Sequence, residues 1–393
     1  MSETAGEAMV ADAVGPPMTP VHAGATLAVG VNSLLVIGVF PALLGGLADE
    51  HRLSAAGIGQ AAMLELLAMA LSTAAAGMLL KARRLRLIGV AASLALAAAD
   101  LAGLGASGAG LLGMRAAAGV MEGILLWITV GMIARTVTPE RWAGVFFTLQ
   151  TLAQLLLAFL LAIWVMPRWG ADGALVALAV SSLLGVAPAL LCPERYAPLP
   201  LAPGASIVPP PRGWAALASV VVYVSALGAV SVYLQPLAHQ AGLSAGVART
   251  ANWTSLAAQV AGGALATTLA GRVRYFTVFI LTTIVSLAVW WIIGRSEPAW
   301  IFVAANAAAG MMGVFMGPFL VPMMIDADPS RRAALQSGAA QLLGGAAGPL
   351  CASLIVGDQD VRAVLWLGAA FALTGLAGVA ALRFVRPRMA ALA

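Results

Sequence analysis

The sequence predicts an all-α membrane protein of twelve spanning helices, arranged as two halves of six. Three observations lead to this fold class: the composition, the lengths of the apolar runs and an internal repeat. Of the 393 residues, 61% are hydrophobic and only 9% are charged, whereas soluble domains carry roughly 25% charged residues. A chain of this composition is expected to lie in a lipid bilayer.

The apolar runs are long enough to cross a bilayer as helices, which takes roughly 20 residues each. Clusters of proline and charged residues separate the runs, and the longest break, residues 193–213, is rich in proline and predicts a linker. We expect spans near residues 24–47, 57–80, 87–105, 108–133, 143–166, 172–192, 214–237, 247–270, 276–294, 299–325, 333–356 and 362–384.

These spans divide the chain into two predicted bundles and three connecting or terminal segments. The first residues carry acidic groups and prolines without a basic stretch, which predicts a disordered tail and not a signal peptide. We expect a disordered cytoplasmic tail at 1–21, a six-helix bundle at 22–192, a cytoplasmic linker at 193–213, a second six-helix bundle at 214–386 and a cytoplasmic tail at 387–393.

The basic residues predict the orientation. If the N-terminus is cytoplasmic, fifteen of the 21 lysines and arginines fall on the cytoplasmic side and five on the other, with Arg115 inside the membrane. Cytoplasmic loops carry the excess of basic residues in membrane proteins. We therefore expect a multi-pass protein of the cytoplasmic (inner) membrane, with both termini and the linker in the cytoplasm.

The two halves resemble each other at nearly one offset, which indicates a duplicated six-helix unit. The matches at an offset of 190 or 191 residues are Leu53-Ser54-Ala55 with Leu243-Ser244-Ala245, Pro139 and Arg141 with Pro329 and Arg331, and Arg115 to Gly119 with Asn306 to Gly310.

Two charges lie inside the apolar run 108–133. Arg115 and Glu122 are seven residues apart, so they share one face of a helix. An ionisable residue inside a membrane is a functional or structural site with a partner by default. The glycines at 119 and 123 suit close packing against a neighbouring helix.

Glu65 lies at a depth in the second span that matches the depth of Arg115 within about 5 Å, or one helical turn. An ion pair between them is therefore predicted, because either charge alone would be costly in the membrane. We expect Asp100, near the outer end of the third span, to be interfacial. Glu122, close to the bilayer middle, is the predicted proton carrier because a carboxyl group there can exchange a proton.

The second half has neutral groups where the first half has charges. Asn306 replaces Arg115, and Ser255 replaces Glu65. A ligand held between the halves is expected to meet charge on one side and amides and aromatic rings on the other, which suits a small polar or amphipathic organic solute. The predicted binding or coupling residues are Arg115, Glu122, Glu65, Asn32, Gln150, Tyr233, Asn252, Gln259, Asn306 and Gln341.

Several function classes find no support in the sequence. The chain has two cysteines and three scattered histidines, without metal-ligand spacing. Its sequence shows no phosphate-binding loop motif, no recognisable pair of nucleophile and base, and no basic patch with interleaved aromatic residues. We expect no cofactor, no metal, no nucleic-acid partner and no enzymatic activity.

Two motifs make the chain, from about residue 22 to 386, resemble the major facilitator superfamily. The fourth span is similar to the family's Arg-containing motif, with Arg115 and Gly119 in place, and the turn Gly77-Met-Leu-Leu-Lys-Ala-Arg-Arg resembles its Gly-x-x-x-Asp-Arg-x-Gly-Arg turn. Lys81 stands at the position of the aspartate that the resemblance implies in gating, and Gly271 stands there in the second copy. The expected gating residues are Lys81, Arg84, Arg272, Pro318 and Pro322, of which the prolines predict a kink.

The resemblance implies a secondary transporter that works by alternating access. We expect a monomer that moves a small organic solute, an organic anion or amphipathic metabolite, and that is coupled to protons. One alternative is drug or metabolite efflux by proton antiport, although span five lacks a Gly-Pro element and Gly344 to Pro349 in span eleven looks like a displaced copy. A second alternative is a transporter-like receptor or a uniporter without proton coupling.

Overall fold

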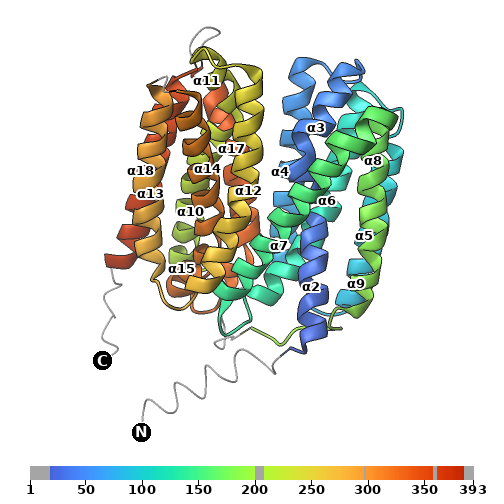
Figure 1. The fold of residues 1–393 in the computed structure, drawn as a ribbon. Coiled ribbons are helices and arrows are strands. Elements are labelled where there is room, and N and C mark those ends of the chain that lie inside the picture. The colour runs from blue at the N-terminus through green and yellow to red at the C-terminus, as the bar shows by residue number, and fades with distance from the viewer. Residues whose placement is uncertain (1–17, 200–207, 296–297, 357–360, 385–393) are drawn as a thin grey trace.

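A computed structural model describes residues 18–199, 208–295, 298–356 and 361–384. The tail predicted at 387–393 lies outside the described residues, as do most of the tail at 1–21 and residues 200–207 of the linker. Figure 1 shows two bundles of helices side by side, the first coloured blue to green and the second yellow to red. Helix α2 begins and helix α18 ends on the same face, which we call the proximal face; the opposite face is the distal face.

The first bundle consists of helices that alternate in direction between the two faces. Its elements are α2 (Pro20–Ser33), α3 (Leu35–Asp49), α4 (Ala55–Leu79), α5 (Leu85–Ala102), α6 (Gly108–Ile133), α7 (Pro139–Leu160), the π-helical turn η1 (Leu161–Val165), α8 (Met166–Leu184) and α9 (Val186–Leu191).

The second bundle repeats this arrangement. Its elements are α10 (Pro211–Val232), α11 (Leu234–Gln240), α12 (Ala245–Leu269), α13 (Tyr275–Gly294), α14 (Ala299–Met316), the 3₁₀ turn η2 (Gly317–Phe319), α15 (Leu320–Ala327), α16 (Arg332–Leu335), α17 (Ser337–Ser353) and α18 (Ala363–Phe384).

Taken in order, these helices cross the molecule twelve times over the described residues, which confirms the predicted all-α membrane fold. Nine described stretches are long and apolar enough to span a membrane, and one of them, residues 139–191, covers two predicted spans. The stretches that do not qualify are α12 and α17. Helix α12 carries Arg249, Asn252 and Gln259, and α17 has only 17 residues. Both pack against the first bundle, where polar side chains need not face lipid.

Broken helices account for the extra elements. Pro318 lies in the 3₁₀ turn η2, between α14 and α15. A proline removes a backbone donor and clashes with the preceding turn, so it interrupts the α-helical hydrogen bonds. The α-helix is therefore interrupted at the proline where a kink was predicted.

Equivalent residues occupy equivalent places in the two halves. Ser54 precedes α4 and accepts a hydrogen bond from the backbone N–H of Gly57 at 3.0 Å. Ser244 precedes α12 and accepts one from Val247 at 3.4 Å. Each serine thus satisfies one of the free donors at the start of its helix. The Leu-Ser-Ala match in the sequence is a matching pair of helix starts.

The described start of the linker packs on the first bundle. The backbone N–H of Leu85 donates to the carbonyl of Glu194 at 3.1 Å, and that of Tyr196 donates to Ala82 at 3.1 Å. The phenol of Tyr196 donates to the carbonyl of Ile128 at 2.9 Å. This segment therefore covers the proximal ends of α4 and α6.

Close approach between the bundles occurs where α7 crosses α12. A Cβ added at Gly144 would lie 2.9 Å from the backbone nitrogen of Thr267, and one at Gly263 would lie 2.9 Å from that of Thr148. The contact is reciprocal, with a glycine of each helix facing a threonine of the other. Only glycine allows backbones to approach this closely.

Candidate functional site

Arg115 is the centre of a buried ionic cluster inside the first bundle. Its Nε donates to Oε2 of Glu65 at 2.9 Å, and its Nη2 pairs with Oε1 of the same carboxylate, so the contact is bidentate. Its Nη1 donates to Oδ1 of Asp100 at 2.6 Å. All three side chains are buried. The ion pair predicted between Glu65 and Arg115 is present, and it joins α4 to α6.

Asp100 is buried inside the first bundle. Its side chain is only 2% exposed, so the expectation that it is interfacial was wrong. It lies two residues before the end of α5, but the long side chain of Arg115 reaches it from α6. Three helices are thus joined through one guanidinium.

Glu122 lies close to this cluster. It interacts electrostatically with Glu65, Arg115 and Asp100, and its Oε2 atom is buried without a hydrogen-bond partner among the described residues. Three carboxyl groups therefore share one guanidinium. Full ionisation would leave uncompensated negative charge in the interior, which binding of a proton relieves.

Close packing of α4 on α6 explains why the charges face each other. A Cβ at Gly119 would collide with the carbonyl oxygen of Glu65, and one at Gly123 would collide with Met69 and Ser72. The two glycines let the helix backbones approach, and the ionic side chains are enclosed between helices of the same bundle. The role that the sequence predicted for these glycines is confirmed by this contact.

A central cavity of about 1020 Å³ lies between the two bundles. It extends from the distal ends of α3, α4 and α12, near Gly45, Ile58 and Arg249, down to Ile133 and Ser337. Its wall is mainly apolar. The polar residues among its described lining are Gln150, Ser231, Arg249, Asn252, Ser337 and Gln341.

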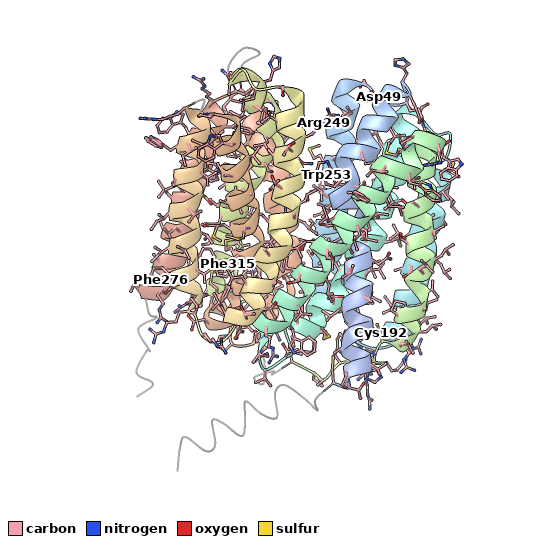
Figure 2. The ribbon with its side chains drawn as sticks, in the orientation of Figure 1. Asp49, Cys192, Arg249, Trp253, Phe276 and Phe315 are labelled. Atoms are coloured by element: carbon pink, nitrogen blue, oxygen red, sulfur yellow. The ribbon has the colours of Figure 1, made fainter. Side chains whose placement is uncertain are left out.

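Arg249 is the one charged residue among the described residues that line this cavity. Figure 2 shows Arg249 and Trp253 on the side of α12 that faces the first bundle, with Arg249 nearer the distal face. The charge of the cavity wall thus comes from the second bundle. From the sequence, the charge was expected from the first bundle, but its charges are enclosed in the cluster around Arg115.

The predicted binding residues divide into two groups. Gln150, Asn252 and Gln341 line the central cavity. The others are not among its described lining residues: Arg115, Glu122, Glu65, Asn32, Tyr233, Gln259 and Asn306.

Two of these amides have other surroundings. The Nδ2 of Asn32 is buried beside Gly185 without a hydrogen-bond partner in the described residues. Asn306 donates to the carbonyl of Phe302, on its own helix, at 2.7 Å. Neither is directed at the central cavity. Arg249 and Ser231 line the cavity and were missed, because spacing in the sequence does not show which face of a helix meets the other bundle.

The proximal face is closed by contacts that bridge the bundles. The Nη1 of Arg331 donates to the carbonyls of Ala134 and Thr136 at 2.8 and 3.0 Å. The Nε2 of Gln336 donates to the carbonyl of Ala74 at 3.4 Å. A cation at the C-terminal end of α6 also meets the negative end of the helix dipole.

A tight turn presents Arg331 to the first bundle. Arg331 has a positive φ of 62°, which is unusual for a side chain other than glycine. Asp328 stabilises this turn by accepting hydrogen bonds from the backbone of Ser330 at 3.0 Å and of Ala333 at 2.8 Å. Burial lowers the pKa of Arg331, which lies outside the spans. The repeat marked Arg331 as the counterpart of Arg141, but nothing in the pattern identified a bridge.

The predicted gating residues lie at or near the proximal face. Lys81, Arg84 and Arg272 are exposed there. Arg84 has a φ of 56° and precedes α5. Pro318 is buried in η2, and Pro322 is partly buried in α15. Their part in gating stays a prediction.

Solved structures share this fold over most of the chain. No protein-family model and no curated protein matches this chain. The human organic anion transporter MFSD10 (TETRAN) aligns with a TM-score of 0.69 at 15% identity, over 92% of this chain and 100% of that one. FucP in the outward conformation aligns with a TM-score of 0.69 at 12% identity, over 92% and 97%. The proton:xylose symporter XylE, bound to 6-bromo-6-deoxy-D-glucose, aligns with a TM-score of 0.68 at 12% identity, over 93% and 96%.

The protein is therefore a polytopic α-helical membrane protein with a cavity between two repeated bundles. More particularly, it has the fold of the major facilitator superfamily.

Proposed function

We propose that this protein is a secondary transporter that moves a small organic solute across the membrane by alternating access. The observation that carries the proposal is the cavity of about 1020 Å³ between the bundles, beneath which contacts such as Arg331 with Ala134 close the proximal face. A drug-sized ligand fits a pocket of roughly 300–1,000 Å³. Opening the proximal face and closing the distal face would carry a ligand in this cavity from one side to the other.

The substrate class we propose is an amphipathic organic anion. Apolar walls favour a hydrophobic body, Arg249 offers one positive charge, and the amides of Gln150, Asn252 and Gln341 offer hydrogen bonds. A guanidinium binds a carboxylate through two parallel hydrogen bonds. One structural neighbour is described as an organic anion transporter, which is consistent with this class.

A thermal-shift screen tests the substrate class, because a ligand that binds the folded state raises its apparent stability. The probes are aromatic carboxylates and their neutral amides. We expect the carboxylates to stabilise the wild type and to lose this effect in Arg249→Gln. Arg168→Gln, at an exposed arginine outside the described cavity lining, is the matched control. Equal shifts from acids and amides, or an unchanged shift in Arg249→Gln, would exclude an anion held by Arg249.

We further propose that transport is coupled to protons and that Glu122 carries the proton. The support is geometric: Glu122 has a buried oxygen without a partner, beside Glu65, Asp100 and Arg115. Leu126, one turn along α6 on the same face, lines the central cavity. A proton on Glu122 is therefore separated from the substrate by about one helical turn.

Transport by protein in liposomes tests the coupling. Glu122→Gln resembles the protonated acid, so we expect it to exchange substrate across the membrane but to lose accumulation driven by a pH gradient. Accumulation with unchanged pH dependence would assign the proton to Glu65 or another group. The alternatives give different results: antiport reverses the gradient that drives uptake, a uniporter shows no pH dependence, and a receptor binds the ligand without moving it.

We also propose that the proximal face lies in the cytoplasm of a cell with a cytoplasmic (inner) membrane, and that the protein works as a monomer. The basic residues Lys81, Arg84 and Arg272 on this face support the orientation, since cytoplasmic loops carry the excess of basic charge. A reporter or protease map that places the linker at 193–213 outside the cell would overturn it.

A further inference from the structure

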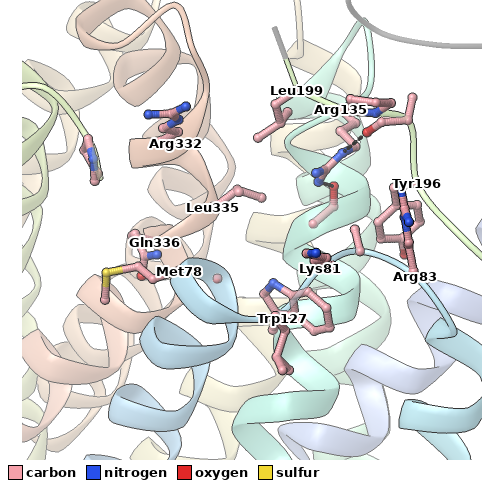
Figure 3. Close-up of a pocket in the computed structure, with 17 residues that line it drawn as sticks. Met78, Lys81, Arg83, Trp127, Arg135, Tyr196, Leu199, Arg332, Leu335 and Gln336 are labelled. Atoms are coloured by element: carbon pink, nitrogen blue, oxygen red, sulfur yellow. Dashed lines mark hydrogen bonds between the residues drawn. The ribbon is translucent and has the colours of Figure 1, made fainter. Parts of the chain in front are cut away.

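A second pocket lies at the proximal face and is formed by both bundles. It has a volume of about 350 Å³. The first bundle contributes the end of α4, the end of α6 and the start of the linker, and the second contributes α16 and Gln336. Figure 3 shows Arg332 and Gln336 on one side of this proximal pocket, opposite Lys81, Arg135 and Tyr196.

The lining of the proximal pocket is basic. Lys81, Arg83, Arg135 and Arg332 contribute to it, and none of its described lining residues is acidic. Tyr196 supplies no negative charge, because burial raises the pKa of its phenol. Several positive charges therefore share a pocket whose described lining residues carry no negative charge.

Arg135 is the most enclosed of these cations. Its guanidinium donates to the carbonyls of Gly131 at 2.8 Å and Ala197 at 2.9 Å, and it lies 5.4 Å from the centre of the Tyr196 ring. Burial lowers the pKa of Arg135 to about 10, so it remains charged at neutral pH. Neutral carbonyls and an aromatic ring leave this positive charge uncompensated.

Repulsion between these positive charges opposes closure of the proximal face. Lys81 belongs to the first bundle and Arg332 to the second, and no described carboxylate lies within ion-pair distance of either. Like charges repel, and the repulsion grows as closure excludes water between them. A negative group between them would turn the repulsion into attraction on both sides.

We propose that the proximal pocket binds an anion with a phosphate or carboxylate group, which bridges the two bundles and stabilises the closed proximal face. The charged group lies among Lys81, Arg135 and Arg332. An apolar portion of the ligand packs on Trp127, Leu199 and Leu335, which complete the wall. The bound anion supplies the negative charge that the turn at Lys81 lacks.

The binding test uses purified protein in phosphatidylcholine nanodiscs, with two separate probes: inorganic pyrophosphate and dioctanoyl phosphatidic acid. Both carry the proposed group, but only the second belongs to a lipid. We expect at least one probe to raise the melting temperature of the wild type. In the double variant Lys81→Gln/Arg332→Gln, the Kd of that probe should rise about tenfold or more, because each tenfold change corresponds to 1.4 kcal/mol.

Arg274→Gln is the matched control, because Arg274 is also an exposed arginine at the proximal face but does not line the pocket. A response to pyrophosphate alone identifies a soluble anion, a response to phosphatidic acid alone identifies a lipid headgroup, and either supports the site. The proposal is overturned if neither probe stabilises the wild type, or if the double variant and the control respond alike.

A distance measurement tests the bridging. Spin labels at Val137 and Phe384 report on opposite bundles at the proximal face, and both side chains are exposed. The native cysteines Cys192 and Cys351 are replaced by serine for specific labelling. The stabilising probe should narrow the distance distribution towards its shorter distances, and an unchanged distribution would refute the bridge. Neither experiment depends on the transported substrate.

Discussion

The two copies of the repeat share a close contact between two helices but differ in the side chains around it. In the first, Gly119 of α6 contacts the backbone at Glu65 of α4, and in the second, Gly310 of α14 contacts Ser255 of α12. The contacts correspond residue by residue. The first copy encloses a cluster of charges there, whereas in the second Asn306 is satisfied by its own helix.

The difference shows that the fold requires the close backbone contact and not the ionic cluster. A close glycine contact is common to both copies, so the fold requires the backbone approach. The second copy achieves that approach without ions, so packing of such a helix pair does not require Arg115, Glu65 or Asp100. The cluster in the first copy is therefore available for a role beyond packing, such as the proton coupling proposed above.

The largest difference between the copies should follow removal of the central cation. Arg115→Gln leaves three carboxyl groups without their guanidinium and should lower the free energy of unfolding by about 3–5 kcal/mol. Asn306→Ala, in the second copy, removes one hydrogen bond and should lower it by about 1 kcal/mol. Thermal and denaturant unfolding in detergent measures both. Equal losses of unfolding free energy would mean that Arg115 contributes no more to stability than Asn306.

The two matching arginines at the proximal face, one in each copy, should also differ in how much they stabilise the closed state. Arg331→Gln removes a charged donor to two carbonyls and should weaken the closed face by about 1.5–3 kcal/mol. Its counterpart Arg141 is exposed, so Arg141→Gln should change stability by less than about 0.5 kcal/mol. Distances between labels at Val137 and Phe384 report the shift. A larger opening in Arg141→Gln would contradict the assigned bridge.

The shared glycine contact should be sensitive in both copies. Gly119→Ala forces a methyl group against the carbonyl of Glu65 and should destabilise the fold by about 1–3 kcal/mol. Gly310→Ala should also destabilise the fold, because its added methyl group would meet the hydroxyl of Ser255 and lie 2.7 Å from the backbone carbonyl oxygen of that residue. Gly313→Ala is the control, since its added methyl would meet no atom nearer than Leu227 at 3.8 Å. An unchanged free energy of unfolding in Gly119→Ala would show that α4 and α6 can separate without loss of stability.

The last prediction concerns the coupling free energy between two members of the cluster. A double-mutant cycle with Glu65→Ser and Arg115→Asn converts the pair to the residues of the second copy. The double variant should recover about 0.5–3 kcal/mol relative to the sum of the single variants. Coupling indistinguishable from zero would mean that the charges act independently, despite their bidentate contact.

The sequence predicted this part of the site because depth can be counted along a helix. Glu65 and Arg115 were paired from their depths alone, and the structure has that pair. Asp100 was misplaced because counting gives the position of a backbone and not the reach of an arginine side chain. The same counting found the twelve crossings and the matching helix starts at Ser54 and Ser244.

The central cavity could not be read from the sequence. Rotation of each helix about its axis decides which residues face the other bundle, and the apolar spans carry little periodicity because lipid and protein interior are both apolar. Gln150, Asn252 and Gln341 were expected in the cavity and line it, whereas Arg249 and the bridge at Arg331 were not foreseen. These last two depend on how the bundles meet, which no local pattern encodes.

The order of the cluster residues along the chain matters for how the protein is made. An arginine at the centre of a helix raises the free energy of membrane insertion by about 2.5–3.5 kcal/mol. Glu65 and Asp100 precede Arg115, so both partners are synthesised before the arginine leaves the ribosome. Asp100 and Arg115 are only fifteen residues apart, on consecutive antiparallel helices. The hairpin of α5 and α6 can therefore enter the bilayer with its ion pair already formed, and biosynthesis never has to expose that arginine alone to lipid.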